Sequence, residues 1–350
     1  MADDLALLLG TKKGAFVLRA VAGWQPEGPY CDAAPVNHMI GCPQTGRLWA
    51  AVGGWFGPGV WRSDDLGATW EKSDTGLAYD AGDGAEVVAI WSLARRDGTL
   101  FAGAQPAGLF ESQDGGATWA HIRGLRDHPT RPDWPPGGAG LTLHHIVADP
   151  VNTDRIWVGI SSAGVFGTTD GGTTWAPMNT GTRNDYAEDP YPVFGQCVHG
   201  LVQVPGSDRL YQQNHCGMYR SDDGAASWVS IEAGLPSTFG FPVAVHPEDP
   251  DTVWLVPMNG DAAGRYPPEG RPGVWRSRDA GATWEVLRSG LPARGYFTVL
   301  RQAMCADAAG LSFGTTSGAV FRSTDDGETW TTLAEHLPAV LSVEAVALPG

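Results

Sequence analysis

Apolar residues in this chain occur in short runs separated by turns rich in Gly, Asp and Pro. Six runs begin with Gly or Ala and end with Ser or Thr, at residues 59–63, 108–112, 164–168, 217–221, 273–277 and 319–323. A second set precedes them, at residues 47–51, 99–103, 155–159, 209–213, 252–256 and 310–314. Aromatic and β-branched runs of this length, bounded by turn residues, predict β-strands. Apolar segments upstream, such as 141–147, predict a further strand in each unit.

A motif of the form Ser-x-Asp-x-Gly-x-Thr-Trp, with small variations, follows each strand of the first set. Its six copies occupy residues 63–70, 112–119, 168–175, 221–228, 277–284 and 323–330, and successive Asp residues are 49, 56, 53, 56 and 46 residues apart. Asp and Ser bond nearby backbone amides at turns, Gly permits positive φ, and Thr and Trp favour the strand that follows. The motif therefore predicts a hairpin turn in a repeat of four strands, as in a propeller blade.

The two ends of the chain predict one more blade than the six motifs do. Residues 5–10, 15–19 and the turn to Trp24 supply three outer strands without an inner one, and residues 341–347 supply an inner strand without the outer three. Pairing the two ends would complete a blade and leave no open edge. We therefore predict an all-β fold, a seven-bladed β-propeller of four-stranded blades closed by the N- and C-terminal strands, with residues 1–350 as a single domain.

Charge and cysteine content restrict the class of function. With 23 basic and 39 acidic residues the formal charge is −16, which disfavours nucleic acid and anionic membranes as partners. Residues 5–9 are too short for a signal-peptide core, and five cysteines without close pairs do not indicate a disulfide framework. The expected location is the cytoplasm.

Long connections predict which face of the ring carries function. Residues 120–140, 176–196 and 258–271 exceed the usual loop length and fall on the face opposite the motif turns. Alignment of the inner strands brings together polar side chains from several blades at the channel entrance on this face: His38, His144 or His145, His199, Arg301 and Glu344. We predict a transition-metal site at His38, His145 and His199, for Zn, Fe or Cu. Packed histidines that fill the channel are the alternative.

The fifth blade adds a second polar cluster. Cys197 and His199 open its inner strand, and His215 and Cys216 lie in the connection between its second and third strands. Two thiols and two imidazoles at one rim favour a metal site or a thiolate activated by an imidazole. Buried, unreactive cysteine is the alternative.

A glycosidase would need two carboxylates flanking the scissile bond. Acidic residues on or near the long-loop face include Asp80, Asp83, Glu86, Asp127, Asp133, Asp185, Glu188, Asp261 and Glu344. Their spacing in the sequence does not identify which two of them would form the catalytic pair.

The repeated motif resembles the Asp-box, or BNR repeat, of sialidases, xyloglucan hydrolases, sortilin-type receptors and a photosystem II assembly factor. The resemblance implies a propeller without fixing a chemistry. A closer resemblance, over almost the whole chain, is to bacterial single-propeller proteins labelled glycosyl hydrolase or exo-sialidase-like. It rests on residues 10–14, 144–145, 212–217, 234–237 and 239–242. The Arg-Ile-Pro motif of sialidases is absent. One propeller cannot reproduce the cleft that xyloglucan hydrolases form between two propellers.

These observations lead to one preferred function and two alternatives. The preferred function is an enzyme with an axial polar pocket, hydrolase-like and metal-assisted, acting on a small-molecule or glycan ligand. Its expected catalytic residues are His199, His215, Cys216, Arg301 and Glu344. The alternatives are a non-catalytic scaffold for a protein or peptide, and a metal-independent glycosidase of the sialidase-like type.

Overall fold

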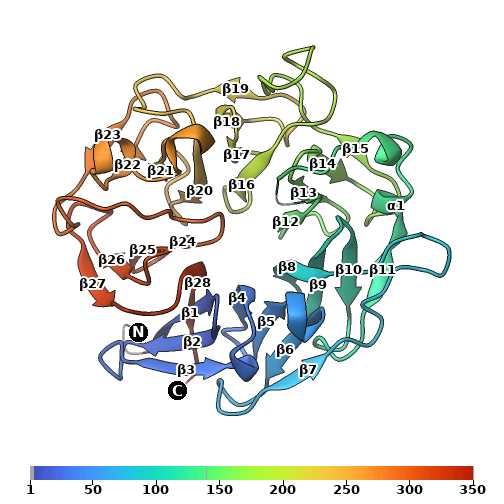
Figure 1. The fold of residues 1–350 in the computed structure, drawn as a ribbon, viewed down its shortest axis with the longest axis horizontal. Coiled ribbons are helices and arrows are strands. Elements are labelled where there is room, and N and C mark those ends of the chain that lie inside the picture. Colours follow the sequence, from blue (N-terminus) through green and yellow to red (C-terminus); the bar gives the residue numbers. More distant parts are fainter. Residues whose placement is uncertain (1–3, 139, 350) are drawn as a thin grey trace.

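The computed structural model describes residues 4–138 and 140–349 and forms a ring of seven four-stranded antiparallel sheets (Figure 1). We number the sheets as blades in chain order. Blade 1 consists of β28 (Val340–Ala347), β1 (Leu5–Thr11), β2 (Gly14–Arg19) and β3 (Pro26–Tyr30). Blade 2 consists of β4 (Val36–Gly41), β5 (Leu48–Val52), β6 (Gly59–Ser63) and β7 (Glu71–Ser73). Blade 3 consists of β8 (Ala89–Arg96), β9 (Thr99–Gln105), β10 (Leu109–Ser112) and β11 (Ala120–Ile122).

The remaining blades follow the same order. Blade 4 consists of β12 (Leu143–Ala148), β13 (Ile156–Ile160), β14 (Gly164–Thr168) and β15 (Ala176–Pro177). Blade 5 consists of β16 (Val198–Gln203), β17 (Leu210–Asn214), β18 (Gly217–Ser221) and β19 (Val229–Ser230). Blade 6 consists of β20 (Gly240–Val245), β21 (Val253–Pro257), β22 (Val274–Ser277) and β23 (Glu285–Leu287). Blade 7 consists of β24 (Met304–Asp307), β25 (Gly310–Gly314), β26 (Val320–Ser323) and β27 (Thr331–Ala334).

The predicted fold and its closure are confirmed. β28 pairs with β1 from Leu5 opposite Ala347 to Thr11 opposite Val340, so the last strand becomes the inner strand of the first blade. Figure 1 shows β28, β4, β8, β12, β16, β20 and β24 nearest the axis. Every side chain of β1 is buried, as expected for a strand with neighbours on both edges and both faces.

The repeated motif forms the turn between the third and fourth strands of blades 2 to 7. In blade 3, Asp114 Oδ1 accepts a hydrogen bond from Thr118 N at 2.9 Å, and Asp114 Oδ2 accepts one from Thr118 Oγ1 at 2.6 Å. Ser112 Oγ donates to Asp114 Oδ1 at 2.8 Å and accepts from Gly116 N at 2.9 Å. These bonds hold the pKa of Asp114 well below its usual range, because they favour the ionised carboxylate. The motif Asp side chains thus bond within their own turns.

Buried tryptophans join neighbouring blades. The indole Nε1 of Trp49, Trp157 and Trp254, each in the second strand of its blade, donates to a backbone carbonyl in the motif turn of the next blade, namely Gly115, Gly224 and Asp326. Each motif turn that receives such a bond is therefore held by its own blade and by the preceding one.

The helical turns all lie on the face opposite the motif turns, within the described part of the chain. They fall in connections between the second and third strands of a blade or from one blade to the next. They are η1 (Cys31–Ala33), η2 (Gly54–Phe56), α1 (Arg123–Arg126), η3 (Arg131–Asp133), η4 (Asp261–Ala263) and η5 (Pro268–Gly270). No helix in residues 4–138 or 140–349 is long and apolar enough to cross a membrane.

Candidate functional site

Two cavities lie close to the axis of the ring. The axial cavity, of about 170 Å³, is bounded by inner strands and includes His38, His145, Arg301 and Glu344 in its lining. The loop pocket, of about 850 Å³, opens on the long-loop face and is lined by residues that include Asn184, Tyr186, Phe194, Cys197 and His215. The predicted site residues therefore divide between two neighbouring spaces.

Bulges in the inner strands decide which side chains meet. The ladder between the first and second strands shifts between Val36 and His38 in blade 2, between Leu143 and His145 in blade 4, and between Val198 and Gly200 in blade 5. The extra residues are thus Asn37, His144 and His199, and a bulge re-aims the side chain that it carries. His199 corresponds to His144, whereas His38 corresponds to His145.

This register corrects the expected metal site at His38, His145 and His199. His38 and His145 line the axial cavity, but His199 does not, and the three imidazoles are not among the described groups whose ligand atoms lie within 4.8 Å of one another. His38 Nδ1 instead accepts a hydrogen bond from Leu93 N at 3.0 Å. Burial lowers the pKa of His38 to about 4 and that of His145 to about 3, so both rings are neutral at pH 7.

Glu344 is the acidic group of the axial cavity. Burial, followed by the negative charge of Asp307, raises its pKa to about 7. Asp307 itself is paired with Arg322, at 2.9 and 3.1 Å. The side chain of Glu344 makes no hydrogen bond or ion pair with any residue in the described part of the chain. The axial cavity therefore holds a carboxyl group that can give or take a proton near neutral pH.

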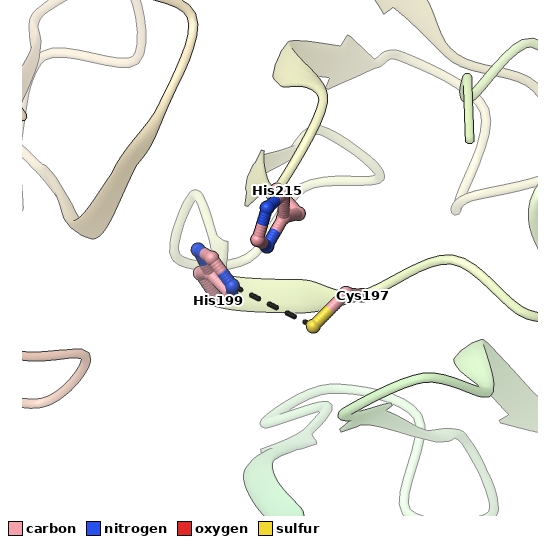
Figure 2. Close-up of side chains that lie close together, drawn as sticks. All are labelled: Cys197, His199 and His215. Atoms are coloured by element: carbon pink, nitrogen blue, oxygen red, sulfur yellow. Dashed lines mark hydrogen bonds between the residues drawn. The ribbon is translucent and has the colours of Figure 1, made fainter. Parts of the chain in front are cut away.

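Cys197, His199 and His215 converge at the edge of the loop pocket (Figure 2). One ligand atom from each lies within 4.8 Å of the others, and Cys197 Sγ is 3.5 Å from His199 Nε2. His199 Nδ1 lies 2.7 Å from the carbonyl oxygen of Gly240, an acceptor, so the ring proton belongs on Nδ1 and Nε2 presents its lone pair to the thiol. Tyr186 Oη lies 3.1 Å from His215 Nε2.

The other predicted thiol, Cys216, is not part of this cluster. It is buried, and burial raises its pKa. Its carbonyl oxygen accepts a hydrogen bond from Tyr219 Oη at 2.7 Å. Cys197 occupies the position that the sequence analysis gave to Cys216 as the reactive thiol. The sequence analysis placed Cys197 at the same rim, and its position next to the inner strand that carries His199 is the signal that favours it.

Arg301 connects the two spaces. Its Cζ lies 5.1 Å from the centroid of the Phe241 ring, on which His199 stacks at 4.6 Å. Burial and the charge of Arg301 hold the pKa of His199 well below its usual range. The guanidinium of Arg301 thus lines the axial cavity and contacts the ring on which His199 of the cluster stacks.

Several loop carboxylates on the same face are neutralised by arginine. Asp80 and Asp127 pair with Arg123, and Asp83 pairs with Arg126 at 3.1 Å. Asp185 pairs with Arg183 at 2.7 Å. The side chain of Asp261 lies outside the described residues. Glu344 differs from these residues in lining the axial cavity, where no ion pair joins its side chain to another described residue.

Comparison with known proteins finds similarity to larger proteins that contain the same architecture. No family model matches it. A xyloglucanase from Paenibacillus sp is 27% identical over 293 residues, and an oligoxyloglucan-reducing end-specific xyloglucanase from Emericella nidulans is 20% identical over 312 residues. These matches cover 73% and 75% of this chain but 26% and 36% of the enzymes. The structure of the Xanthomonas campestris GH74 xyloglucanase matches 95% of this chain and 53% of that chain, with a TM-score of 0.69 and 20% identity.

These similarities are to xyloglucanases, which the sequence resemblance ranked as more distant relatives than the sialidase-like single-propeller proteins. The resemblance to those single-propeller proteins stays a prediction. The chain spans between a quarter and about a third of the length of the curated enzymes that it matches. We conclude that it is a seven-bladed β-propeller similar to glycosyl hydrolases that act on xyloglucan.

Proposed function

We propose that this protein is a hydrolase-like enzyme that binds a glycan at the axis of its long-loop face. The observation that carries the proposal is Glu344, a carboxyl group with a pKa of about 7 that lines the axial cavity. Such a group is present in both protonation states at neutral pH, as acid–base catalysis requires. Similarity to two xyloglucanases supports a saccharide as the ligand.

The loop pocket provides the binding surface. Its volume of about 850 Å³ falls in the range of ligand sites, and an oligosaccharide segment fits within it. Tyr186 and Phe194 offer aromatic faces for the apolar side of a sugar ring, and Asn184 and His215 offer polar groups for its hydroxyls. The site is therefore suited to a neutral sugar.

Glu344 performs the proton transfer in this proposal. Among the described side chains, Glu344 is the carboxyl group that lines either cavity, so the proposal assigns the proton transfer to it. Water attacks the anomeric carbon, the glycosidic C–O bond breaks, and Glu344 protonates the leaving oxygen. The attacking water releases its proton to solvent, from which Glu344 regains one, and Arg301, which lines the same cavity, orients the substrate.

Hydrolysis of aryl glycosides and of xyloglucan oligosaccharides tests the proposal. Glu344→Gln is expected to lower kcat by about 10²–10⁴ with little change in saccharide affinity, because only the proton transfer is removed. Glu188→Gln, which changes an exposed acidic side chain in a long loop, is the matched control and should retain activity. If neither binding nor turnover is measured with any saccharide in the panel, the proposal is wrong.

A peptide-binding scaffold is the second candidate. Apolar and aromatic side chains are unusually exposed on the long-loop face, with Trp55 fully exposed, Phe56 at 50% and Val193 at 67%. Exposed apolar surface favours a protein partner. A Trp55→Ala/Phe56→Ser variant would lose a peptide ligand while retaining saccharide binding, and this separates the two candidates.

A further inference from the structure

We propose that Cys197, His199 and His215 form a binding site for Zn²⁺, with a fourth coordination position open to the loop pocket. One thiolate and two imidazoles are ligands that zinc prefers, and hard ions such as Mg²⁺ or Ca²⁺ take oxygen ligands instead. The inference goes beyond glycan hydrolysis, since the ion can bind whether or not the protein acts on a saccharide.

The spacing of the ligand atoms matches a tetrahedral zinc ion. With Zn–S near 2.3 Å and Zn–N near 2.05 Å, tetrahedral angles place sulfur and nitrogen ligand atoms about 3.6 Å apart. Cys197 Sγ and His199 Nε2 are 3.5 Å apart. The ligand atoms of all three residues lie within 4.8 Å of one another, so a small adjustment of the His215 side chain would complete the set.

Backbone and ring contacts hold the ligands in place. The amide of His215 donates to the carbonyl of Cys197 at 2.8 Å, which ties the two ligand segments together. His199 Nδ1 bonds the Gly240 carbonyl, so Nε2 is the nitrogen available to an ion. The His199 ring also stacks on Phe241 with an interplanar angle of 26°. These contacts are typical of the shell around a metal ligand, which fixes both tautomer and ring direction.

The site has an open side suited to a catalytic ion. Cys197 and His215 line the loop pocket, whereas His199 is buried beneath them. Three protein ligands with an accessible fourth position are the arrangement of catalytic zinc, in which the last position binds water or substrate. The fourth coordination position of the ion thus faces the loop pocket, in which a ligand would bind.

A second acidic and imidazole cluster provides a useful contrast. Asp80, Asp83 and His121 also lie within 4.8 Å of one another, but Arg123 and Arg126 neutralise the two carboxylates. No cation is expected there. At Cys197, His199 and His215 the ligand set is instead a thiol and two imidazoles, which are groups that zinc prefers.

Metal analysis of the purified full-length chain tests the site. After treatment with chelator and reconstitution with Zn²⁺, we expect one zinc per chain and a higher Tm than in the metal-free protein, because an ion that binds only the folded state stabilises it. Substitution with Co²⁺ should give a sulfur-to-cobalt charge-transfer band. A zinc content near zero after reconstitution, or selective binding of copper in competition with zinc, would overturn the proposal.

Variants assign the ligands. Cys197→Ser and His215→Gln are partly exposed positions at which folding should be retained, and each should lower zinc affinity at least tenfold and remove or shift the cobalt band. Cys216→Ser changes the adjacent thiol outside the cluster, and His38→Gln changes an imidazole of the axial cavity. Both controls should bind zinc as the unmodified protein does. Loss of zinc from Cys216→Ser with retention by Cys197→Ser would contradict the assignment.

Discussion

The carboxylate side chains on the long-loop face and in the axial cavity differ in whether they form an ion pair. Asp83, Asp127 and Asp185 are paired with arginine, whereas Glu344 shares the axial cavity with Arg301 and two neutral imidazoles and forms no ion pair with a described residue. The same burial acts in opposite directions on the two kinds of group: it raises the pKa of the carboxyl and lowers that of His38. Between about pH 4 and pH 7 the carboxyl group of Glu344 and the imidazole of His38 are therefore both neutral.

The raised pKa of Glu344 predicts a pH-dependent stability. The folded carboxyl titrates at about 7 and an unfolded one at about 4.3, so between these values the folded state binds a proton that the unfolded state lacks. The free energy of unfolding therefore falls as pH rises through this window, by up to about 3 kcal/mol. Urea unfolding at pH 5 and pH 8 should show that Glu344→Gln removes this loss.

His38 and His145 act in the opposite sense, because their lowered pKa values make stability rise with pH from about 4 to 6.5. Their effect is common to both proteins and cancels when the variant is compared with the unmodified chain. Glu188→Gln is the control and should follow the unmodified protein at both pH values. A Glu344→Gln variant that does the same would show that Glu344 titrates normally.

At the scale of strands and turns, the sequence predicts the bounds of a strand well where an apolar run and the turn residues beside it agree. The apolar runs predicted at 47–51 and 59–63 became β5 and β6, because short apolar runs bounded by turn-forming residues specify them locally. The site was less predictable, because the inner strands of blades 4 and 5 carry bulges at His144 and His199, so that His199 is equivalent to His144 and not to His145. A bulge depends on pairing with the neighbouring strand, which the inner-strand sequence does not show.

Substitution of Trp157 measures how much a hydrogen bond between neighbouring blades stabilises the fold. Its buried indole donates to Gly224 O at 2.9 Å in the next blade, and Trp157→Phe removes that bond and leaves the carbonyl unsatisfied. We expect a loss of about 1–3 kcal/mol in the free energy of unfolding, measured with urea. Trp61→Phe is the matched control, since the Trp61 Nε1 is buried without a hydrogen-bond partner and its removal should cost less. Equal losses would show that ring packing, rather than the bond between blades, determines the effect.

At the scale of the whole molecule, both ends of the chain contribute to one blade, and that blade also carries Glu344. The closure was predictable because the incomplete sets of strands at residues 5–19 and 341–347 complement each other. The division of polar residues between an axial cavity and a loop pocket was not, since it depends on how seven blades place their inner strands around one axis. The strand that closes the ring is thus also a strand of the candidate site.

Removal of β28 tests this dual role. A chain that ends at Ala339 leaves the edge of β1 unpaired, and an apolar strand with an open edge promotes aggregation. We expect a lower Tm, broader unfolding and self-association by light scattering, whereas a chain that ends at Leu348 should match the full-length protein. Because β28 pairs with β1 along its length, a synthetic peptide of residues 340–348 added in trans should restore a monomeric fold. The same peptide with Glu344→Gln should restore folding without acid–base activity. A truncated chain that stays folded, monomeric and active without any peptide would show that neither the closure of the ring nor Glu344 is required.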